Sequence, residues 1–337
     1  MKNFITSPAP HIHGNDSVRR NMLLVILALL PAYVVSVLEF GIGALITAAI
    51  SVCACVLVEW LISRFMLKEK RQTIGDLSAV LTGLLLAFNL PSSIDWWIVL
   101  IGAVVAIGVG KMSFGGLGQN PFNPALVGRV FLLISFPQQM TTWPVAKGFE
   151  TNYVDAVAEA TPLYYLKHLI GLENGAEAEK TIGQLPSLWD SLIGAMGGSL
   201  GEVCALALIL GGIFLICTRV ITWHIPVSII ATVALFAACL GWAGQLPEGL
   251  DTCHFVGYEL LTGGLMLGAF FMATDYVTSP MTAKGKILFG IGIGVIMMVI
   301  RTWGNYPEGM SFAILIMNAC VPLLNKFRPQ RFGEKKK

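Results

Sequence analysis

The chain has 337 residues, of which 55% are hydrophobic and only 12% are charged. Soluble domains carry roughly twice that share of charge, so the composition excludes an ordinary soluble enzyme and a disordered chain. The 22 Lys and Arg residues are dispersed, which argues against a nucleic-acid-binding patch. The seven cysteines contain no CxxC pair and are interpreted as mostly small buried apolar residues, not as metal ligands or disulfides.

Apolar segments follow one another along the chain, most of them close to the roughly 20 residues that a transmembrane helix needs. A polar stretch divides them into two groups of five. We therefore predict an all-α polytopic membrane protein of about ten transmembrane helices. The approximate limits of the segments are 21–38, 43–63, 76–90, 96–112, 122–136, 198–218, 224–243, 256–274, 286–303 and 309–324.

Basic residues gather at the segment ends that lie on one side of the membrane, together with both chain termini. Acidic residues gather in the central polar stretch. By the positive-inside rule, both termini are expected in the cytoplasm and the central loop outside it. The expected parts are a cytoplasmic N-terminus (1–20), a first five-helix repeat (21–136), an extracytoplasmic loop (137–189), a second five-helix repeat (190–325) and a basic cytoplasmic tail (326–337).

A weak internal repeat supports this division, because Leu81–Leu84 (Leu-Thr-Gly-Leu) matches Leu261–Gly264 (Leu-Thr-Gly-Gly). Five spans is an odd number, so the second repeat must run inverted relative to the first. Inverted repeats commonly place a ligand or ion site where the halves meet, near short or interrupted segments. Segments 76–90 and 256–274 are of this kind. Short helices with little tilt are the alternative interpretation.

Arg129 falls near the middle of an apolar segment, where a charge is costly and function is the first hypothesis. The alternative is a structural ion pair with Glu59, Glu202 or Glu259, or a position close to the membrane edge. Either way, Arg129 is expected to have a partner.

Two loops carry polar groups at membrane depth. The loop 114–125 combines three glycines with Asn120 and Asn123, whose amides offer paired donors and acceptors for a flavin ring or a urea-like solute. A glycine-rich turn with an asparagine cap is the alternative. The loop 273–280 offers Asp275 and Thr278, with helix termination and ordinary capping as the alternative. On the residues alone, the chain is a polytopic carrier or channel with a site at the repeat interface.

Taken together, these segments resemble the RnfD/NqrB family. They are similar to the D subunit of the Rnf electron-transport complex and, more distantly, to the B subunit of the sodium-pumping NADH:quinone oxidoreductase. The resemblance covers nearly the whole chain. It is carried by the opening Ser7–His13, the segment Asp76–Pro91, the glycine–asparagine loop, Gly268–Pro280 and Ser311–Ala319.

The resemblance implies a urea-transporter-like fold and FMN joined to a threonine by a phosphoester. Asp155 and Thr161 match the family's acceptor pattern, with Ala158 and Glu159 in place of its usual hydroxyl residue and glycine. On composition alone, Thr161 before a proline is an ordinary turn residue.

A second, non-covalent flavin such as riboflavin is implied at the asparagines. The candidate cofactor-binding residues are Thr161, Asn120, Asn123, Thr82, Arg129, Asp275 and Thr278, with Arg129 a candidate to stabilise an anionic flavin. No catalytic or metal-binding residue is expected.

The resemblance also implies a function: electron relay between ferredoxin and NAD in the bacterial cytoplasmic membrane, coupled to Na⁺ or H⁺ movement. The implied partners are the other Rnf subunits (a membrane iron–sulfur pair, the FMN-bearing G subunit, and peripheral iron–sulfur and NADH-binding subunits), a flavin transferase and membrane lipid. The alternatives are a urea-transporter-like solute channel or carrier without redox activity, and a purely structural anchor.

Overall fold

A computed structural model of the chain describes residues 17–67, 73–144, 158–170, 176–194, 196–202, 204–247, 249–306 and 308–326. Over these ranges the chain is helical, apart from a pair of two-residue strands. The expectation of an all-α fold is therefore confirmed. The predicted motif at Ser7–His13, Asp155, and nearly all of the N-terminal and C-terminal parts lie outside the described residues.

The first part of the chain folds into five α-helices joined by short π- and 3-10 turns. The α-helices are α1 (Val18–Phe40), α2 (Ile42–Leu61), α3 (Ser78–Phe88), α4 (Trp96–Val104) and α5 (Pro124–Ser135). The short turns are η1 (Ile62–Met66), η2 (Thr73–Asp76), η3 (Val105–Val109) and η4 (Met112–Phe114).

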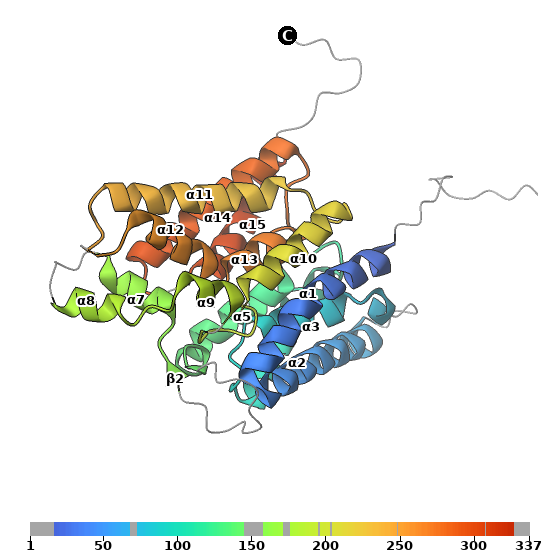
Figure 1. The fold of residues 1–337 in the computed structure, drawn as a ribbon. Helices are drawn as coiled ribbons and strands as arrows, with labels where there is room; N and C mark the ends of the chain where they lie inside the picture. Colours follow the sequence, from blue (N-terminus) through green and yellow to red (C-terminus); the bar gives the residue numbers. More distant parts are fainter. Residues whose placement is uncertain are drawn as a thin grey trace, which may run out of the picture.

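The central polar stretch contains short elements rather than a bare loop. They are α6 (Pro137–Met140), β1 (Trp143–Pro144), β2 (Ala158–Glu159), α7 (Pro162–Leu169), α8 (Ala176–Ile182) and α9 (Leu188–Ile193). The strands pair antiparallel, with Trp143 opposite Glu159. Helix α7 contacts α12 and α14, and in Figure 1 it lies with α8 at the end of the molecule opposite the start of α1.

The last part again contains long helices, one of them interrupted. Its elements are α10 (Ala205–Cys217), α11 (His224–Trp242), α12 (Thr252–Leu261), α13 (Leu265–Leu267), η5 (Gly268–Met272), α14 (Ala283–Trp303) and α15 (Met310–Leu324). Each of the ten apolar segments predicted from the sequence thus corresponds to a helix or to a run of adjoining helical elements.

Among the described residues, five helical runs are long and apolar enough to cross a membrane by themselves. They are Val18–Phe40, Ile42–Met66, Trp96–Phe114, His224–Trp242 and Ala283–Trp303. A sixth span is possible if α12 and the run Leu265–Met272 count together, although the two are bent by 58°. Helices α3, α5, α10 and α15 are apolar but shorter. The chain is therefore a multi-pass membrane protein, while the number ten stays a prediction.

Large apolar side chains on the outer faces of the helices fit this conclusion. Leu38 of α1, Leu210 of α10 and Leu235 of α11 are each more than half exposed. In water such a surface would be an aggregation hazard, whereas lipid tails solvate it without cost.

Helices from the two ends of the chain pack directly against each other. Helix α1 packs against α10, and α5 packs against α15. At Gly211 the α1–α10 contact is so close that an added Cβ would lie 2.4 Å from the Ala28 carbonyl oxygen. A side chain at that position would force the two backbones apart, so glycine sets the helix separation.

The two segments expected to be short or interrupted are so in the structure. Helix α3 has 11 residues and begins after Leu77, whose φ of 65° is left-handed. The second segment breaks at Gly263 (φ 72°), where an added Cβ would meet the side chains of Leu163 and Arg301. Both the left-handed backbone and the lack of space for a β-carbon therefore require glycine at the break.

Candidate cofactor pocket and buried charge cluster

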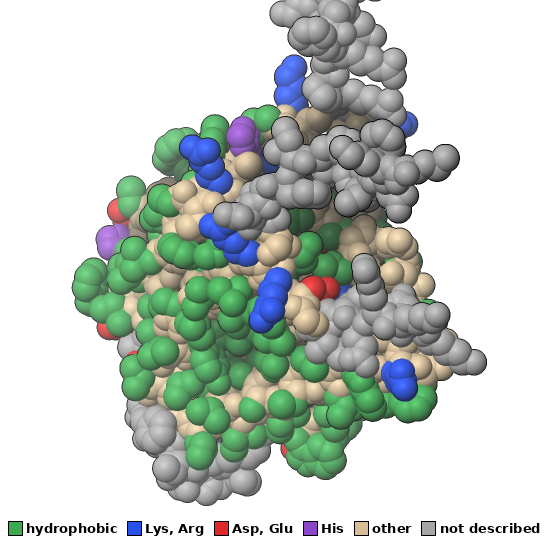
Figure 2. Space-filling view, turned by 90° about the vertical axis from the view of Figure 1, so that its right-hand side faces the viewer, with side chains coloured by type: hydrophobic (Ala, Val, Ile, Leu, Met, Phe, Trp, Pro, Cys, Tyr) green, Lys and Arg blue, Asp and Glu red, His purple; other side chains and the backbone are tan. Residues whose placement is uncertain are grey.

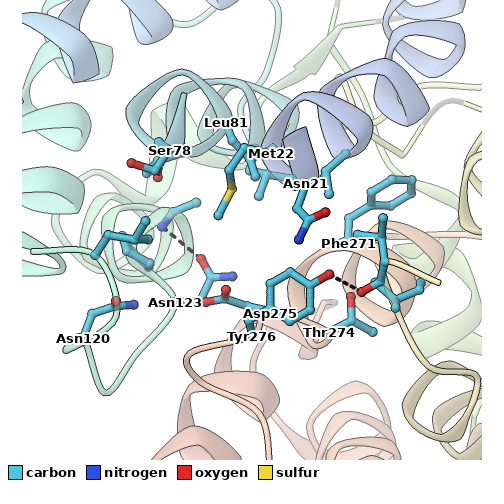
Figure 3. Close-up of a pocket in the computed structure, with 18 of the residues that line it drawn as sticks. Asn21, Met22, Ser78, Leu81, Asn120, Asn123, Phe271, Thr274, Asp275 and Tyr276 are labelled. Carbon is cyan, nitrogen blue, oxygen red and sulfur yellow. Dashed lines mark hydrogen bonds between the residues drawn. The ribbon is translucent and has the colours of Figure 1, made fainter. Parts of the chain in front are cut away.

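A cavity of about 740 Å³, partly open to the outside, lies where α1, α3, the loop before α5, the end of α10 and η5 come together. We call it the asparagine cavity. Figure 3 shows polar groups of Asn120, Asn123 and Asp275 on its wall, with Asn21 and Met22 of α1 across from them. Its lining, mostly apolar residues with polar groups among them, is of the kind found at small-molecule and cofactor sites.

The loop that leads to Asn120 takes its shape from glycines. Gly115, Gly116 and Gly118 have φ of 107°, 92° and 94°, a backbone region that side chains other than glycine rarely adopt. The Asn120 amide nitrogen donates to the Phe122 carbonyl at 2.9 Å. Its oxygen, Oδ1, is buried and finds no partner among the described residues. A buried amide oxygen of this kind is an acceptor available to a ligand.

Asn123 has a different local role. Its Oδ1 accepts the backbone N–H groups of Ala125 (3.1 Å) and Leu126 (3.4 Å), and so caps α5. Its Nδ2 donates to the Met272 carbonyl at 3.2 Å, which ties the loop to η5. The asparagine-cap interpretation is therefore confirmed for Asn123, and its side chain is largely committed to the fold.

Thr82 and Asp275 also line the asparagine cavity, from opposite ends of the sequence. The Thr82 hydroxyl donates to the Ser78 carbonyl at 2.9 Å and keeps its acceptor lone pairs. The Asp275 carboxylate accepts from the Thr278 hydroxyl at 3.2 Å and from two backbone N–H groups of its own turn. Thr278 is buried beside Asp275 and does not itself line the cavity. The structure thus brings four of the predicted residues to one cavity.

Lys111 is a polar residue of this cavity that the sequence reasoning did not select as a site residue. Its ammonium donates to Glu59 Oε2 and to the Ser78 hydroxyl, both at 2.7 Å, and the side chain is only 2% exposed. Lys111 stands at the end of the predicted segment 96–112, where a lysine side chain normally reaches water. A partner in another segment, Glu59, is what permits its burial.

Arg129 does not reach the asparagine cavity. Its guanidinium forms an ion pair with Glu308, donates to the Asn89 amide oxygen, and lies 3.9 Å from Glu202 Oε1. Of the three partners considered from the sequence, only Glu202 is near, and the direct partner is Glu308. The structure therefore places Arg129 away from the asparagines beside which a flavin was expected, because Arg129 lines a different cavity.

That second cavity, of about 410 Å³, is called the arginine cavity. It lies beneath the β1 end of the central stretch and the turn before α15. Its lining residues are Arg129, Leu133, Met140, Thr141, Trp143, Tyr306, Glu308, Ser311 and Phe312.

The other two acids considered for Arg129 have partners of their own. Arg301 forms a 2.7 Å ion pair with Glu259 and donates to the Thr262 carbonyl at the break after α12. Glu59 pairs with Lys111, as described above. Each pair leaves no unbalanced charge in the protein interior, as burial requires.

Thr161 stands alone, at the start of α7. Its side chain is 8% exposed and makes no capping hydrogen bond to the helix that follows it. Helix α7 is held in place by Lys167, whose ammonium donates to the Gly304 carbonyl. Burial lowers the pKa of Lys167. Thr161 is buried because α7 packs against α12 and α14, and a polar stretch of sequence does not predict that packing.

Comparisons with known proteins cover almost the whole chain. The model of the NQR2, RnfD, RnfE family matches residues 5–333. The D subunit of the Na(+)-translocating ferredoxin:NAD(+) oxidoreductase complex of Acetobacterium woodii is 45% identical over 334 residues, which are 98% of this chain and 95% of the relative. The proton-translocating counterpart of Clostridium ljungdahlii is 43% identical, covering 99% and 97%. The D subunit of the ion-translocating oxidoreductase complex of Erwinia tasmaniensis is 39% identical, covering 99% of both chains.

Proposed function

The chain belongs to the NQR2, RnfD, RnfE family, and from this membership we propose that it is the D subunit of an ion-translocating ferredoxin:NAD(+) oxidoreductase complex. It is a membrane subunit of the Rnf complex, and the enzyme is the complex, not this chain alone. Relatives named for Na⁺ and for proton translocation are similarly close, so the name of a relative does not select the coupling ion.

We propose that the asparagine cavity holds a non-covalent flavin such as riboflavin. The free Asn120 Oδ1 is the observation that carries this proposal, because a flavin ring has one apolar side and one edge of hydrogen-bond donors and acceptors. The mostly apolar wall suits the first, and Asn120, Thr82 and Asp275 suit the second. A flavin bound there supplies the redox chemistry, while the protein orients it and keeps water from it.

We further propose FMN on Thr161. The support is a hydroxyl that does not cap α7 although the residue sits at the N-cap position, where threonines commonly do so. At 8% exposure the hydroxyl is out of reach of a transferase while α7 is docked. Attachment is therefore expected before α7 packs onto α12 and α14.

The arrangement in the membrane is also a proposal: ten spans in two inverted five-helix repeats, urea-transporter-like. In support, helices of the two halves pair, α1 with α10 and α5 with α15. Figure 2 shows Lys and Arg side chains spread over the face on which the chain's N-terminal helix begins, with few acidic ones. By the positive-inside rule that face is cytoplasmic, so both termini lie inside and the central stretch, 137–189, lies outside.

The membrane is proposed to be the bacterial cytoplasmic membrane. The partners proposed for this chain are the remaining members of the complex: a membrane iron–sulfur pair, the FMN-bearing G subunit, and peripheral iron–sulfur and NADH-binding subunits. A flavin transferase is required for maturation. Electron transfer across the membrane needs cofactors close to both of its faces. The asparagine cavity lies at the start of α1, and α7, which begins after Thr161, lies at the opposite end of the molecule (Figure 1).

The experiment is a denaturing gel of the purified complex, read for flavin fluorescence and followed by peptide mass spectrometry. We expect fluorescence in the band of this chain and FMN on the peptide that contains Thr161. Thr161→Ala should abolish both, together with ferredoxin:NAD electron transfer. The matched control is Thr142→Ala, an exposed threonine of the same stretch.

A dark wild-type band from cells with an active transferase would refute the covalent flavin. If the chain also releases no flavin when denatured, a solute channel or carrier becomes the better account. Electron transfer that survives Thr161→Ala would instead favour a structural anchor.

A further inference from the structure

The carboxyl groups of Glu202 and Glu308 meet inside the protein beside one guanidinium. Arg129 forms an ion pair with Glu308 and lies 3.9 Å from Glu202 Oε1. Both carboxyl groups therefore lie beside the same Arg129 nitrogen, Nη2. Two carboxylates that share one counter-charge repel each other when both are ionised, so this arrangement favours a proton on one of them.

The charges around this pair lead to the same count. Arg129 reaches it from α5. Arg301 of α14 pairs with Glu259 of α12 and donates to the Thr262 carbonyl, two residues before Gly264, whose N–H donates to Glu308. The ammonium of Lys167 donates to the Gly304 and Tyr306 carbonyls and forms no ion pair with these acids. Counting only the groups that these ion pairs join among the described residues, two guanidinium groups face three carboxylates, a net charge of −1. A buried unbalanced charge is costly, and a single proton removes it.

Unpartnered polar atoms mark the same place. Glu202 Oε1 and the hydroxyl of Ser311 are buried and have no hydrogen-bond partner among the described residues. The side chain of Glu202 is 6% exposed, and Ser311 is 4% exposed and lines the arginine cavity with Glu308. That cavity extends to Thr141, which is exposed. The arginine cavity therefore extends from Glu308 and Ser311 to the surface beneath β1.

We propose that Glu202 and Glu308 share one exchangeable proton beside Arg129, and that this proton exchanges through the arginine cavity. The site lies apart from the asparagine cavity and from Thr161, and it does not depend on a bound flavin. It provides this chain with a group that can take up and release a proton at the junction of α5, α10 and α15.

The test is infrared spectroscopy of the whole complex at neutral pH, read at the C=O stretch of protonated carboxyl groups. Exposed acids are ionised at this pH and do not contribute to the band. Glu202→Gln and Glu308→Gln should each remove the same one-proton band, because either change leaves two guanidinium groups facing two carboxylates. Each variant is first shown to assemble. Should one fail to assemble, the other carries the test.

The matched control is Glu59→Gln, which removes a buried carboxylate that forms an ion pair with Lys111. It should leave the band unchanged. A wild-type complex without such a band, or a band that survives both Glu202→Gln and Glu308→Gln, would overturn the proposal.

The route is tested with a second pair of variants. Thr141→Trp places bulk at the mouth of the arginine cavity, whereas Thr142→Trp places it one residue further on, outside the lining. After transfer to D₂O, the band should shift several-fold more slowly in Thr141→Trp than in Thr142→Trp or in the wild type. Equal rates in all three would show that the proton does not exchange through this cavity.

Discussion

The asparagine cavity and the arginine cavity differ in how their polar groups are used. In the first, Asn120 lines a mostly apolar space, and its buried Oδ1 lacks a donor among the described residues. In the second, the guanidinium of Arg129 is already held by Glu308 and Asn89, and the space is smaller. An uncommitted polar atom in a roomy apolar pocket suits a large ligand with a polar edge. A smaller space beside charged groups that mostly pair with one another suits a proton or a water molecule. The variants below test this contrast, from the largest expected effect to the smallest.

Arg129→Met should have the largest effect, and it should be on folding. It removes the partner of Glu308 and leaves two buried carboxyl groups without a counter-charge. Breaking a buried pair from one side costs about 3–5 kcal/mol. We expect the subunit to accumulate poorly and the complex to melt at a clearly lower temperature. Arg64→Met, at an exposed arginine, is the control and should be silent.

A stable Arg129→Met complex that has lost only its flavin would contradict the contrast. It would mean that the arginine serves a cofactor rather than the fold. The asparagine cavity and the arginine cavity would then belong to one extended site.

Asn123→Ala should have an intermediate effect, on stability. The variant loses the cap of α5, which is worth about 1 kcal/mol, and the link from Asn123 to Met272. Thermal melting of the complex checks this, with Gln119→Ala as an exposed control in the same loop. If Asn123→Ala melts like the wild type yet releases its flavin, then the amide contacts the ligand and the cap is incidental.

Thr82→Val should have the smallest effect. It keeps the shape of the side chain and removes a hydroxyl whose acceptor lone pairs are open to the flavin, since its proton is donated to the Ser78 carbonyl. A single neutral hydrogen bond contributes about 0.5–1.5 kcal/mol, so flavin affinity should fall by a factor of about ten or less. Equilibrium dialysis of the free flavin measures it. A loss of about a hundredfold or more would make Thr82 a principal ligand group.

Much of the fold follows from patterns that depend on the chain alone. Apolar runs locate the helices. The segment around Thr82 could be predicted as short, and the one around Gly263 as interrupted, because the polar and glycine residues responsible lie within or next to each segment. Polar residues of the asparagine cavity could also be predicted, because Asn120 and Asp275 lie in loops that place polar groups at membrane depth. That Asn120 and Asp275 line the same cavity depends on the tertiary fold. From the sequence, only the expected site between two inverted repeats pointed to such a meeting.

Partners contributed by distant segments are what the sequence did not reveal. Glu308 stands in a short polar turn between two helices and resembles an ordinary surface residue, yet it is the main partner of Arg129. From the sequence, Lys111 is a lysine at the end of a helix, and nothing local indicates its ion pair with Glu59. The burial of Thr161 depends on how α7 docks, and the composition of a polar stretch gives no information about docking.

The most direct test of the central claim is the non-covalent flavin content of the purified complex, measured as flavin released on denaturation. The account predicts about one released flavin attributable to this chain. Asn120→Ala should lower its retention by about tenfold or more, because a buried ligand group loses its partner. Gln119→Ala should retain it, and the covalent band at Thr161 should be unchanged in both. Equal release from Asn120→Ala and wild type would contradict the assignment of the asparagine cavity as a flavin site.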